Sequence, residues 1–276
     1  IVQPTADRAY TLVSEAIDRS GQVVGTLAPE AGMVAAAPLL RERPILTHRD
    51  MAMSHGAMRD GVAHQDGMDH AAMGHGAAAP QRHDHKLGAG VDMVAESPAS
   101  RLDFPGLGLE DAPHRTLRYS ELRSLAPNPD ARAPEREMEI HLTGNMERYM
   151  WSFDGVKFSH VDKPILLQEG ERVRVTLVND TMMTHPIHLH GMFFDLVVDD
   201  SAHKPRKHTV NVKPGDKLSF DLTADAVGDW AFHCHLLFHM HAGMMQIVSV
   251  IPRTPGPLSD NAPVTEASLT QRKGHQ

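Results

Sequence analysis

The chain has 276 residues, enough for one or two domains, and carries a net charge of −8. This charge argues against nucleic-acid binding and leaves no basic face for anionic lipids. No apolar run approaches the length of a membrane span, so we expect none. A single cysteine excludes an internal disulfide, and the start at Ile1, without a charged-then-apolar leader, is typical of a mature product or a fragment.

Two short strands are predicted near the beginning of the chain. The run YTLVSEAIDRSGQVVGTLAPE favours a strand, a turn at Ser20-Gly21 and a second strand. Because two strands alone are marginally stable in water, we expect residues 1–46 to belong to a larger neighbouring unit.

The composition changes abruptly after residue 46. Branched aliphatic residues are nearly absent between Met51 and His85, so this segment cannot bury enough apolar surface to offset its ordering entropy. Residues 47–112 are therefore interpreted as a flexible Met/His-rich tract and linker. Thioethers suit Cu(I), and the methionines that would recruit it are Met51, Met53, Met58, Met68 and Met73. The alternative interpretation is a plain solvated linker.

Residues 113–251 are predicted to form a β domain. Short β-prone runs are separated by Gly, Pro, Asn and Asp turns, among them MEIHLTG, ERVRVTLVND, FFDLVVDD, KHTVNVKPGD, KLSFDLTA, DWAFHCH and MMQIVSVI. In ERVRVTLVND apolar and polar residues alternate with the period of a half-buried strand. Closely spaced strands of this kind favour a sandwich or a barrel. The polar, Pro-rich tail of residues 252–276 is expected to be disordered.

The densest group of chemically active side chains lies in HCHLLFHMHAGMM. His233 and His235 flank Cys234, His239 follows the cysteine by five residues, and Met244 follows His239 by five more. A cysteine, two histidines and a methionine make a blue-copper site, in which the methionine is a weak axial ligand. The alternative is a His-rich surface strand beside a buried free cysteine.

A second motif, HPIHLHG, supplies a candidate for the missing imidazole at His185. Because side chains two apart on a strand share a face, the flanking histidines of the first motif point away from Cys234. One face is predicted to gather His188, His190, His233 and His235. The other is predicted to gather His185, Cys234, His239 and Met244. Two metal sites joined through the peptide neighbours of the cysteine suit electron transfer.

These two motifs resemble those of the multicopper oxidases, specifically the bacterial copper-resistance (CopA-type) group. GNMERYMWSFDGVKFS and the Met/His-rich tract are similar to the same branch. The resemblance implies a β class of fold, with a cupredoxin-like Greek-key β-sandwich or barrel at residues 113–251. It also implies that residues 1–46 are the end of a preceding cupredoxin-like domain.

The resemblance further implies copper of three types as the cofactor. The type 1 ligands would be His185, Cys234, His239 and Met244. The type 2 ligand would be His188, and the type 3 ligands would be His190, His233 and His235. The type 2 and type 3 coppers form a trinuclear cluster where dioxygen is reduced to water, and Cys234, His233 and His235 would link the two sites during catalysis.

One departure from the family pattern concerns the rest of the cluster. The family completes it with two further His-x-His pairs from its first domain, and the sequence offers no credible match. His83-Asp84-His85 has the spacing but no strand around it. We therefore expect the C-terminal part of a longer oxidase, with N-terminal cupredoxin domains as its partners. Met240 and His241 stand where several relatives carry an acidic residue, so the proton-delivery group stays unassigned.

The function predicted on this basis is a periplasmic copper-dependent oxidase that serves copper resistance. Its partners would be copper ions and dioxygen, and its electron donor Cu(I) or a phenol. The alternative is a non-catalytic periplasmic protein that sequesters copper through the Met/His-rich tract. An isolated electron carrier is a third alternative, but a carrier needs no second group of paired histidines.

The remaining candidates have plainer interpretations. Histidines without paired spacing are expected to be ordinary surface or loop residues: His48, His114, His141, His160, His203 and His208. Met182 and Met183 are expected to pack near the copper, and Trp151 and Trp230 to fill the β core. The acidic residues Asp195, Asp199 and Asp200 are interpreted as strand-end and turn residues.

Overall fold

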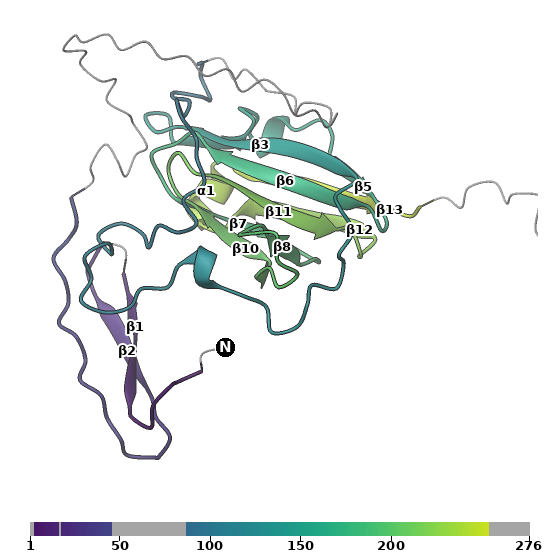
Figure 1. Ribbon diagram of the computed structural model, residues 1–276. Coiled ribbons are helices and arrows are strands. Elements are labelled where there is room, and N and C mark those ends of the chain that lie inside the picture. The colour runs from purple at the N-terminus through teal and green to yellow at the C-terminus, as the bar shows by residue number, and fades with distance from the viewer. Residues whose placement is uncertain (1–2, 17, 46–86, 254–276) are drawn as a thin grey trace, which may run out of the picture.

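The computed structural model describes residues 3–16, 18–45 and 87–253. Two sheets in this part pack face to face (Figure 1). The five-stranded sheet consists, in spatial order, of β10 (Thr209–Val212), β7 (His185–Leu189), β12 (Gly228–Cys234), β13 (Met245–Ile251) and β5 (Ile165–Gln168). The six-stranded sheet consists of β4 (Met150–Phe153), β3 (Arg136–Asn145), β6 (Arg172–Asn179), β11 (Lys217–Thr223), β8 (Phe194–Leu196) and β9 (Arg206–Lys207).

The chain crosses repeatedly between the two sheets. From β5 to β8, successive strands alternate between the five-stranded and the six-stranded sheet. Two neighbouring pairs, β3 with β6 and β5 with β13, run parallel, and parallel neighbours need a crossing connection. The other pairs of the sandwich are antiparallel. The predicted cupredoxin-like β-sandwich is confirmed.

The sequence pattern of β6 explains which of its side chains face the core. Val173, Val175 and Leu177 are buried, as their alternation predicts. Between them Arg174 points to the other face, where its guanidinium donates to Asp221 over 2.8 Å. Arg172 departs from this pattern, because it is buried and bonded to a carboxylate of β8 rather than exposed.

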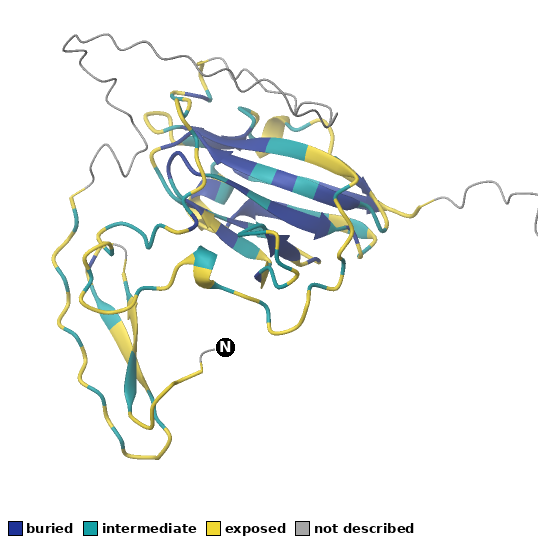
Figure 2. Ribbon diagram, in the orientation of Figure 1, coloured by how far each residue is buried: buried dark blue, intermediate teal, exposed yellow. Residues whose placement is uncertain are grey.

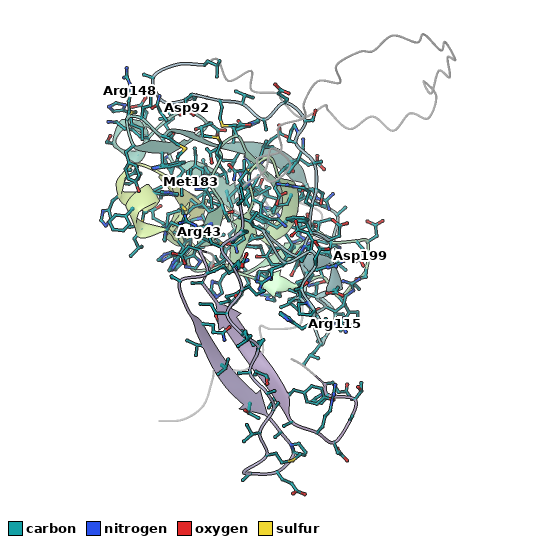
Figure 3. All side chains as sticks on the ribbon, turned by 90° about the vertical axis from the view of Figure 1, so that its left-hand side faces the viewer. Arg43, Asp92, Arg115, Arg148, Met183 and Asp199 are labelled. Atoms are coloured by element: carbon teal, nitrogen blue, oxygen red, sulfur yellow. The ribbon has the colours of Figure 1, made fainter. Side chains whose placement is uncertain are left out.

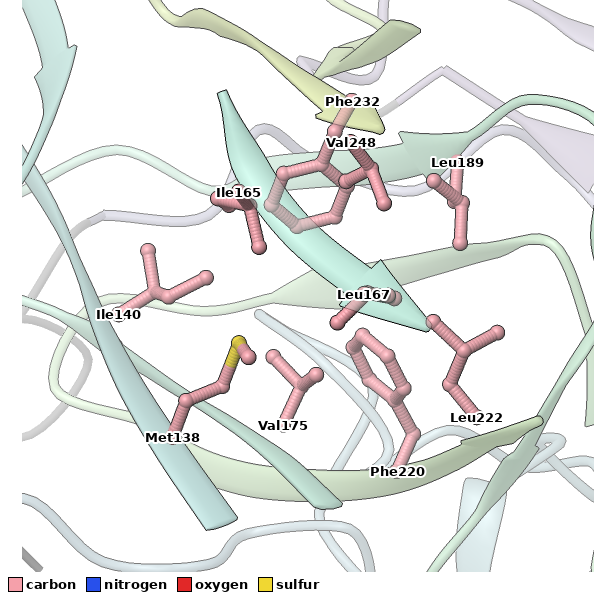
Figure 4. Close-up of a pocket in the computed structure, with 10 residues that line it drawn as sticks. All are labelled: Met138, Ile140, Ile165, Leu167, Val175, Leu189, Phe220, Leu222, Phe232 and Val248. Carbon is pink, nitrogen blue, oxygen red and sulfur yellow. The ribbon is translucent and has the colours of Figure 1, made fainter. Parts of the chain in front are cut away.

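The core between the sheets is apolar. Figure 2 shows the buried stretches concentrated on the strands of the sandwich. A pocket between the layers is lined entirely by apolar side chains (Figure 4), namely Met138, Ile140, Ile165, Leu167, Val175, Leu189, Phe220, Leu222, Phe232 and Val248. Such a lining gives water no polar partner, so the pocket belongs to the hydrophobic core.

The elements that were not predicted from the sequence include β4, β5 and the short helix α1 (Leu237–His241). The two strands have four residues each, too few for a clear alternation. The helix has five residues and no side-chain cap, so it carries no local signal.

The two strands predicted near the beginning of the chain are present. β1 (Tyr10–Glu15) and β2 (Gln22–Leu27) form an antiparallel hairpin that extends away from the sandwich (Figure 1). Arg19 lies in its turn with a positive φ of 60°, and its guanidinium donates to the carbonyl of Leu107 over 2.7 Å. Both strands are largely exposed, so the hairpin has little core of its own.

Residues 87–135 lie before β3, the first strand of the sandwich, and are mostly irregular. Their regular elements are a short 3-10 helix at Tyr119–Glu121 and isolated bridges. Polar contacts fix the segment on the sandwich, including an ion pair of 2.7 Å between Arg101 and Asp216. In Figure 3, Asp92 lies near Arg148 at one end of the molecule, where the Asp92 carboxylate accepts from the amide of Met146 over 2.9 Å.

Other predictions lie outside the described residues. The copper-recruiting methionines Met51 to Met73, the His83 and His85 pair, His48 and the tail from residue 254 are among them. The domain boundaries at residues 46, 112 and 251 stay predictions. Within the described residues, no helix has the length and apolarity needed to cross a membrane.

Candidate metal centre

Three donor atoms converge between the start of β7, the end of β12 and α1. Sγ of Cys234 lies 3.6 Å from Nδ1 of His185 and 3.8 Å from Nδ1 of His239, and the two ring nitrogens are 3.1 Å apart. A point equidistant from the three atoms is about 2.0 Å from each, close to the ~2.0–2.3 Å that imidazole and thiolate ligands make to a first-row metal such as zinc. All three residues are buried. This group, together with Met244, is called the buried site below.

The backbone explains why residues from three elements meet. β7 and β12 are antiparallel neighbours, and Cys234 is paired with Ile187, two residues from His185. Met244 is fully buried, its amide donates to the carbonyl of His239 over 3.0 Å, and its carbonyl accepts from the amide of Cys234 over 3.1 Å. These two bonds hold the α1 loop closed over the site.

Gly243 makes this closure sterically feasible. Its φ is +126°, in the region that favours glycine. A Cβ atom there would lie 2.6 Å from the carbonyl oxygen of Trp151. The loop between His239 and Met244 can therefore approach β4 only with a glycine at this position.

Burial controls protonation in the buried site. Desolvation lowers the pKa of His185 to about 3, with a smaller contribution from His239, and lowers the pKa of His239 to about 4. Desolvation also raises the pKa of the Cys234 thiol to about 11. In the absence of a cation all three groups are therefore uncharged at neutral pH. A metal that binds here must displace the thiol proton, because the thiolate is the ligand.

A buried threonine fixes the tautomer of His185. Nδ2 of Asn179 donates to the carbonyls of Met183 and Val212, so its Oδ1 is left to accept the hydroxyl proton of Thr181 over 2.9 Å. The Thr181 oxygen can then accept from Nε2–H of His185 over 2.7 Å. This arrangement leaves a lone pair on Nδ1 of His185, the atom that faces Cys234. Outer-shell bonds of this kind orient metal ligands.

Trp151 lies directly against the two histidines of the buried site. Its ring is stacked on His239 with centroids 4.0 Å apart and an interplanar angle of 24°, and meets His185 edge-on at 5.1 Å. It was predicted to fill the β core, and it is fully buried. Its contact with the site has no signal in the sequence, because more than thirty residues separate it from either histidine.

The second group of histidines lies on the opposite faces of β7 and β12. His188 and His233 are directly paired across the two strands, and the donor atoms of His188, His190 and His233 lie within 4.8 Å of one another. Nε2 of His190 is 3.0 Å from Nε2 of His233. His235 is exposed at the rim, with its ring centroid 5.6 Å from that of His188. We call these four histidines the exposed cluster.

Backbone carbonyls fix two tautomers in the exposed cluster. Nδ1–H of His188 donates to the carbonyl of His208 over 2.7 Å, and Nδ1–H of His233 donates to the carbonyl of Cys234 over 3.0 Å. Each ring therefore turns an Nε2 lone pair towards its neighbours. Imidazoles with free Nε2 atoms accept copper, so this donor set also fits the metal.

Two of the histidines expected to be ordinary have other surroundings. His141 is not a surface residue: it is buried, and its Nδ1 lies 2.6 Å from a carboxylate oxygen of Asp180. His208 is exposed, but its ring lies beside His188, with the two Nδ1 atoms 3.2 Å apart. The remaining described members, His114, His160 and His203, are exposed or half-buried.

The acidic residues and the second tryptophan have structural surroundings. Asp195 is buried within β8 and forms an ion pair of 3.0 Å with Arg172, so the prediction of a strand-end residue was wrong for it. Asp199 pairs with Arg123 at the surface over 2.7 Å. Trp230 is half-buried against the core, and its indole nitrogen donates to the carbonyl of Ala226.

Residues 131–254, which contain all the histidines of both groups, match the family described as multicopper oxidase. Residues 131–254 thus form a multicopper oxidase domain, and the family binds copper.

Among the relatives are proteins named for copper resistance. The chain is 47% identical over 282 residues to the copper resistance protein A homolog of Pseudomonas syringae pv. tomato, covering 91% of this chain and 46% of that protein. It is 44% identical over 294 residues to copper resistance protein A of Escherichia coli, covering 91% of this chain and 47% of that protein. The chain thus spans about half the length of the curated relatives it matches.

Solved structures of multicopper oxidases also match. One is the multicopper oxidase from Campylobacter jejuni described as a metallo-oxidase, at 20% identity and a TM-score of 0.41, with 51% of this chain and 34% of that chain covered. Another is Fet3p, described as a multicopper oxidase that functions in iron import, at 19% identity and a TM-score of 0.43, with 51% of this chain and 36% of that chain covered.

Proposed function

We propose that the chain is the copper-binding part of a copper-dependent oxidase that oxidises Cu(I) or phenolic donors and reduces dioxygen to water. The observation that carries this proposal is the convergence of His185, Cys234 and His239 in a buried site closed by Met244. A thiolate, two imidazoles and a thioether are the ligands of blue copper. Copper held there would supply one-electron chemistry, accepting single electrons from a donor.

The chain's own residues contribute insulation and geometry to this site. Burial keeps water away from the ligands, and the Thr181 hydroxyl holds the ring of His185 with Nδ1 towards the metal position. The backbone of α1 and the Gly243 turn keep His239 and Met244 at the mouth of the site. A site that is rigid before the metal binds costs little reorganisation when an electron arrives.

The exposed cluster is proposed to form half of a trinuclear copper site. In this assignment His188 binds type 2 copper, and His190, His233 and His235 bind type 3 copper. The carbonyl of Cys234 accepts from Nδ1–H of His233, so the cysteine is linked to the cluster by a hydrogen bond as well as by the peptide chain. This path of bonds offers a short route for electrons between the two groups.

The cluster is open on the side that faces away from the sandwich, because His190 and His235 are exposed. We propose that further cupredoxin domains of the intact protein cover this side and supply the other imidazoles. Residues 1–46 would be the end of one such domain, which accounts for the largely exposed hairpin. The Met/His-rich tract before the sandwich would recruit Cu(I), and the protein would serve copper resistance in the periplasm.

Oxygen consumption tests this proposal. The intact protein that contains this chain, loaded with copper, is expected to consume dioxygen when Cu(I) or hydroquinone is added, with one dioxygen used for four electrons delivered. The alternative is a protein that only sequesters copper, and it predicts copper binding without oxygen uptake. A copper-loaded intact protein that binds Cu(I) but consumes no oxygen would establish that alternative.

A further inference from the structure

The turn before β4 places an aromatic ring at the surface above the buried site. Tyr149 is 51% exposed and has a positive φ of 50°. Its amide donates to the carbonyl of Met146 over 3.3 Å, and the amide of Met146 donates to Asp92 over 2.9 Å. A non-glycine residue with positive φ is costly and is kept only where surrounding contacts impose it. Here the two hydrogen bonds hold the turn at Met146 and at Tyr149.

A continuous series of ring contacts leads from this tyrosine to the metal ligands. The ring of Tyr149 meets that of Trp151 edge-on, with centroids 6.1 Å apart and an angle of 89°. Trp151 is in turn stacked on His239 at 4.0 Å, and the ring of Tyr149 also meets that of His239 edge-on, with centroids 6.3 Å apart. Because His239 is only 3% exposed, an electron donor in solvent has little access to its ring.

The position of Trp151 is imposed by the backbone around it. A Cβ at Gly144, on the neighbouring strand, would lie 2.7 Å from the indole ring. Within the described residues its Nε1 has no hydrogen-bond partner, so a polar contact does not account for its orientation. The indole is therefore held by packing alone, between β3 and the imidazole of His239.

We propose that Tyr149 is the surface at which phenolic donors deliver electrons to the buried copper, and that Trp151 carries the electrons from Tyr149 to His239. This inference rests on the proposed function. In each event a phenolic donor loses one electron and releases its hydroxyl proton to solvent, and the Cu(II) held by the ligands gains that electron and becomes Cu(I). The electron tunnels through the two rings, which are not themselves oxidised, so no bond forms or breaks in the protein and Tyr149 keeps its proton.

A phenol is the donor that this surface fits best. A flat aromatic donor can stack on the exposed ring of Tyr149, and the adjoining Met146, which is 43% exposed, offers a further apolar contact. A donor stacked on Tyr149 in this way lies closer to Trp151, which shortens the path of the electron. The competing surface is Phe238, which is 79% exposed and directly precedes His239 on α1.

Anaerobic reduction of the copper-loaded chain by hydroquinone tests the proposal. The loss of the blue absorption would be followed by stopped flow in the wild type, Tyr149→Phe, Tyr149→Leu and, as the matched control, Phe238→Leu. Both Tyr149 variants keep a Cβ, so the strain at this positive φ is the same. The second-order rate constant should stay within about twofold in Tyr149→Phe and in Phe238→Leu, and fall by about tenfold in Tyr149→Leu, where aromatic stacking is lost.

Two results would overturn the proposal: an unchanged rate constant in Tyr149→Leu, or a larger loss in Phe238→Leu than in Tyr149→Leu. The blue band and the reduction potential should stay unchanged in all variants, because neither ring is a ligand. Failure of the proposed function would look different, since the wild type itself would then show no blue band.

Tryptophan fluorescence supplies a readout independent of electron transfer. In a Trp230→Phe background Trp151 is the sole tryptophan. Adding one equivalent of Cu(II) to the copper-free chain should quench most of its emission, because the indole is stacked on a ligand. Emission that survives copper binding would show that Trp151 is not coupled to the metal position, and would refute the relay.

Discussion

The buried site and the exposed cluster lie on the same two strands, yet they differ in completeness. Residues of β7 and β12 that point inward meet α1 and form a closed, buried set of donors. Residues that point outward, at and just after the ends of the same strands, form a group in which His190 and His235 are exposed to solvent. In the proposed assignment, this change of face separates a complete metal site from half of a trinuclear site. The alternation of side chains would then decide which site the chain can build alone.

The difference has an electrostatic consequence. In the buried site desolvation keeps both imidazoles and the thiol uncharged, so the site is ready for a soft cation and disfavours protons on the imidazoles. In the exposed cluster desolvation also lowers the pKa of His188 and His233, the two members that are least accessible. The outer members, His190 and His235, stay open to solvent, where water competes with a metal.

The largest effect is expected from Cys234→Ser. A hydroxyl is a hard and poorly ionised replacement for a thiolate, so the blue copper–thiolate absorption should disappear completely, while the small volume change leaves the fold intact. Visible absorption and far-ultraviolet circular dichroism of the copper-treated variant measure both effects. A variant that stays blue would refute the assignment of Cys234 as a copper ligand.

A smaller effect is expected from Met244→Leu. The axial thioether is a weak, long ligand that tunes the potential, so its loss should keep the blue colour and raise the reduction potential, because oxidised copper loses a donor. The volume of the fully buried side chain is nearly conserved. Redox titration followed at the blue band measures the shift. A lower potential, or a colourless protein, would mean that Met244 is not the axial ligand.

Thr181→Val is expected to act on stability more than on colour. The substitution keeps the shape but leaves Nε2–H of His185 and Oδ1 of Asn179 with one partner fewer in a buried position, at a cost of about 1–3 kcal/mol. Urea unfolding of the copper-free chain gives the loss. Thr181→Ser, which keeps the hydroxyl, serves as the control and should recover most of the stability. Equal stability of the wild type and the valine variant would refute the role of this bond.

The smallest effect is a dependence on pH through His141, whose partner Asp180 directly precedes Thr181. Burial lowers the pKa of His141, but the hydrogen bond and the charge of Asp180 outweigh burial and leave the pKa raised. The ion pair therefore stabilises the fold fully below the unfolded pKa of about 6.5, and this contribution is lost as the pH rises through the folded pKa.

The measurement is the difference in unfolding free energy between the wild type and His141→Gln at pH 5.5 and at pH 8.5. The advantage of the wild type should be larger at pH 5.5. An advantage that is equal at both pH values, or larger at pH 8.5, would mean that the histidine is not charged in the fold.

Local sequence patterns predicted which donor residues come together in the two sites. They did not predict which other residues surround those donors. The spacing around Cys234, together with strand alternation, was enough to predict which histidines share a face. Thr181 and Trp151 could not be predicted, because their contacts with His185 and His239 depend on how a loop and a distant strand pack. The same limit applies to His141: a lone histidine carries no sign that Asp180 will be its buried partner.

The strands show the same contrast between elements with a local sequence pattern and elements without one. β6 and β11, with clear alternation, were predicted, whereas β4 and β5 were not, because four residues in a strand carry too little periodicity. α1 was not predicted for a similar reason, because its five residues show no helical period. The loop that follows it is held by the hydrogen bond from the amide of Cys234 to the carbonyl of Met244, a contact with β12 that leaves no local signature.

Copper titration of this 276-residue chain tests most directly the claim that the buried site is complete and the exposed cluster is not. The copper-free chain would be titrated with Cu(II) under visible absorption, alongside a variant with both His188→Ala and His190→Ala. The blue band should saturate at one equivalent in both proteins, and neither should reduce dioxygen to water at a steady rate. A blue band that is lost in the His188/His190 variant, or sustained four-electron reduction of dioxygen by the chain alone, would contradict this account.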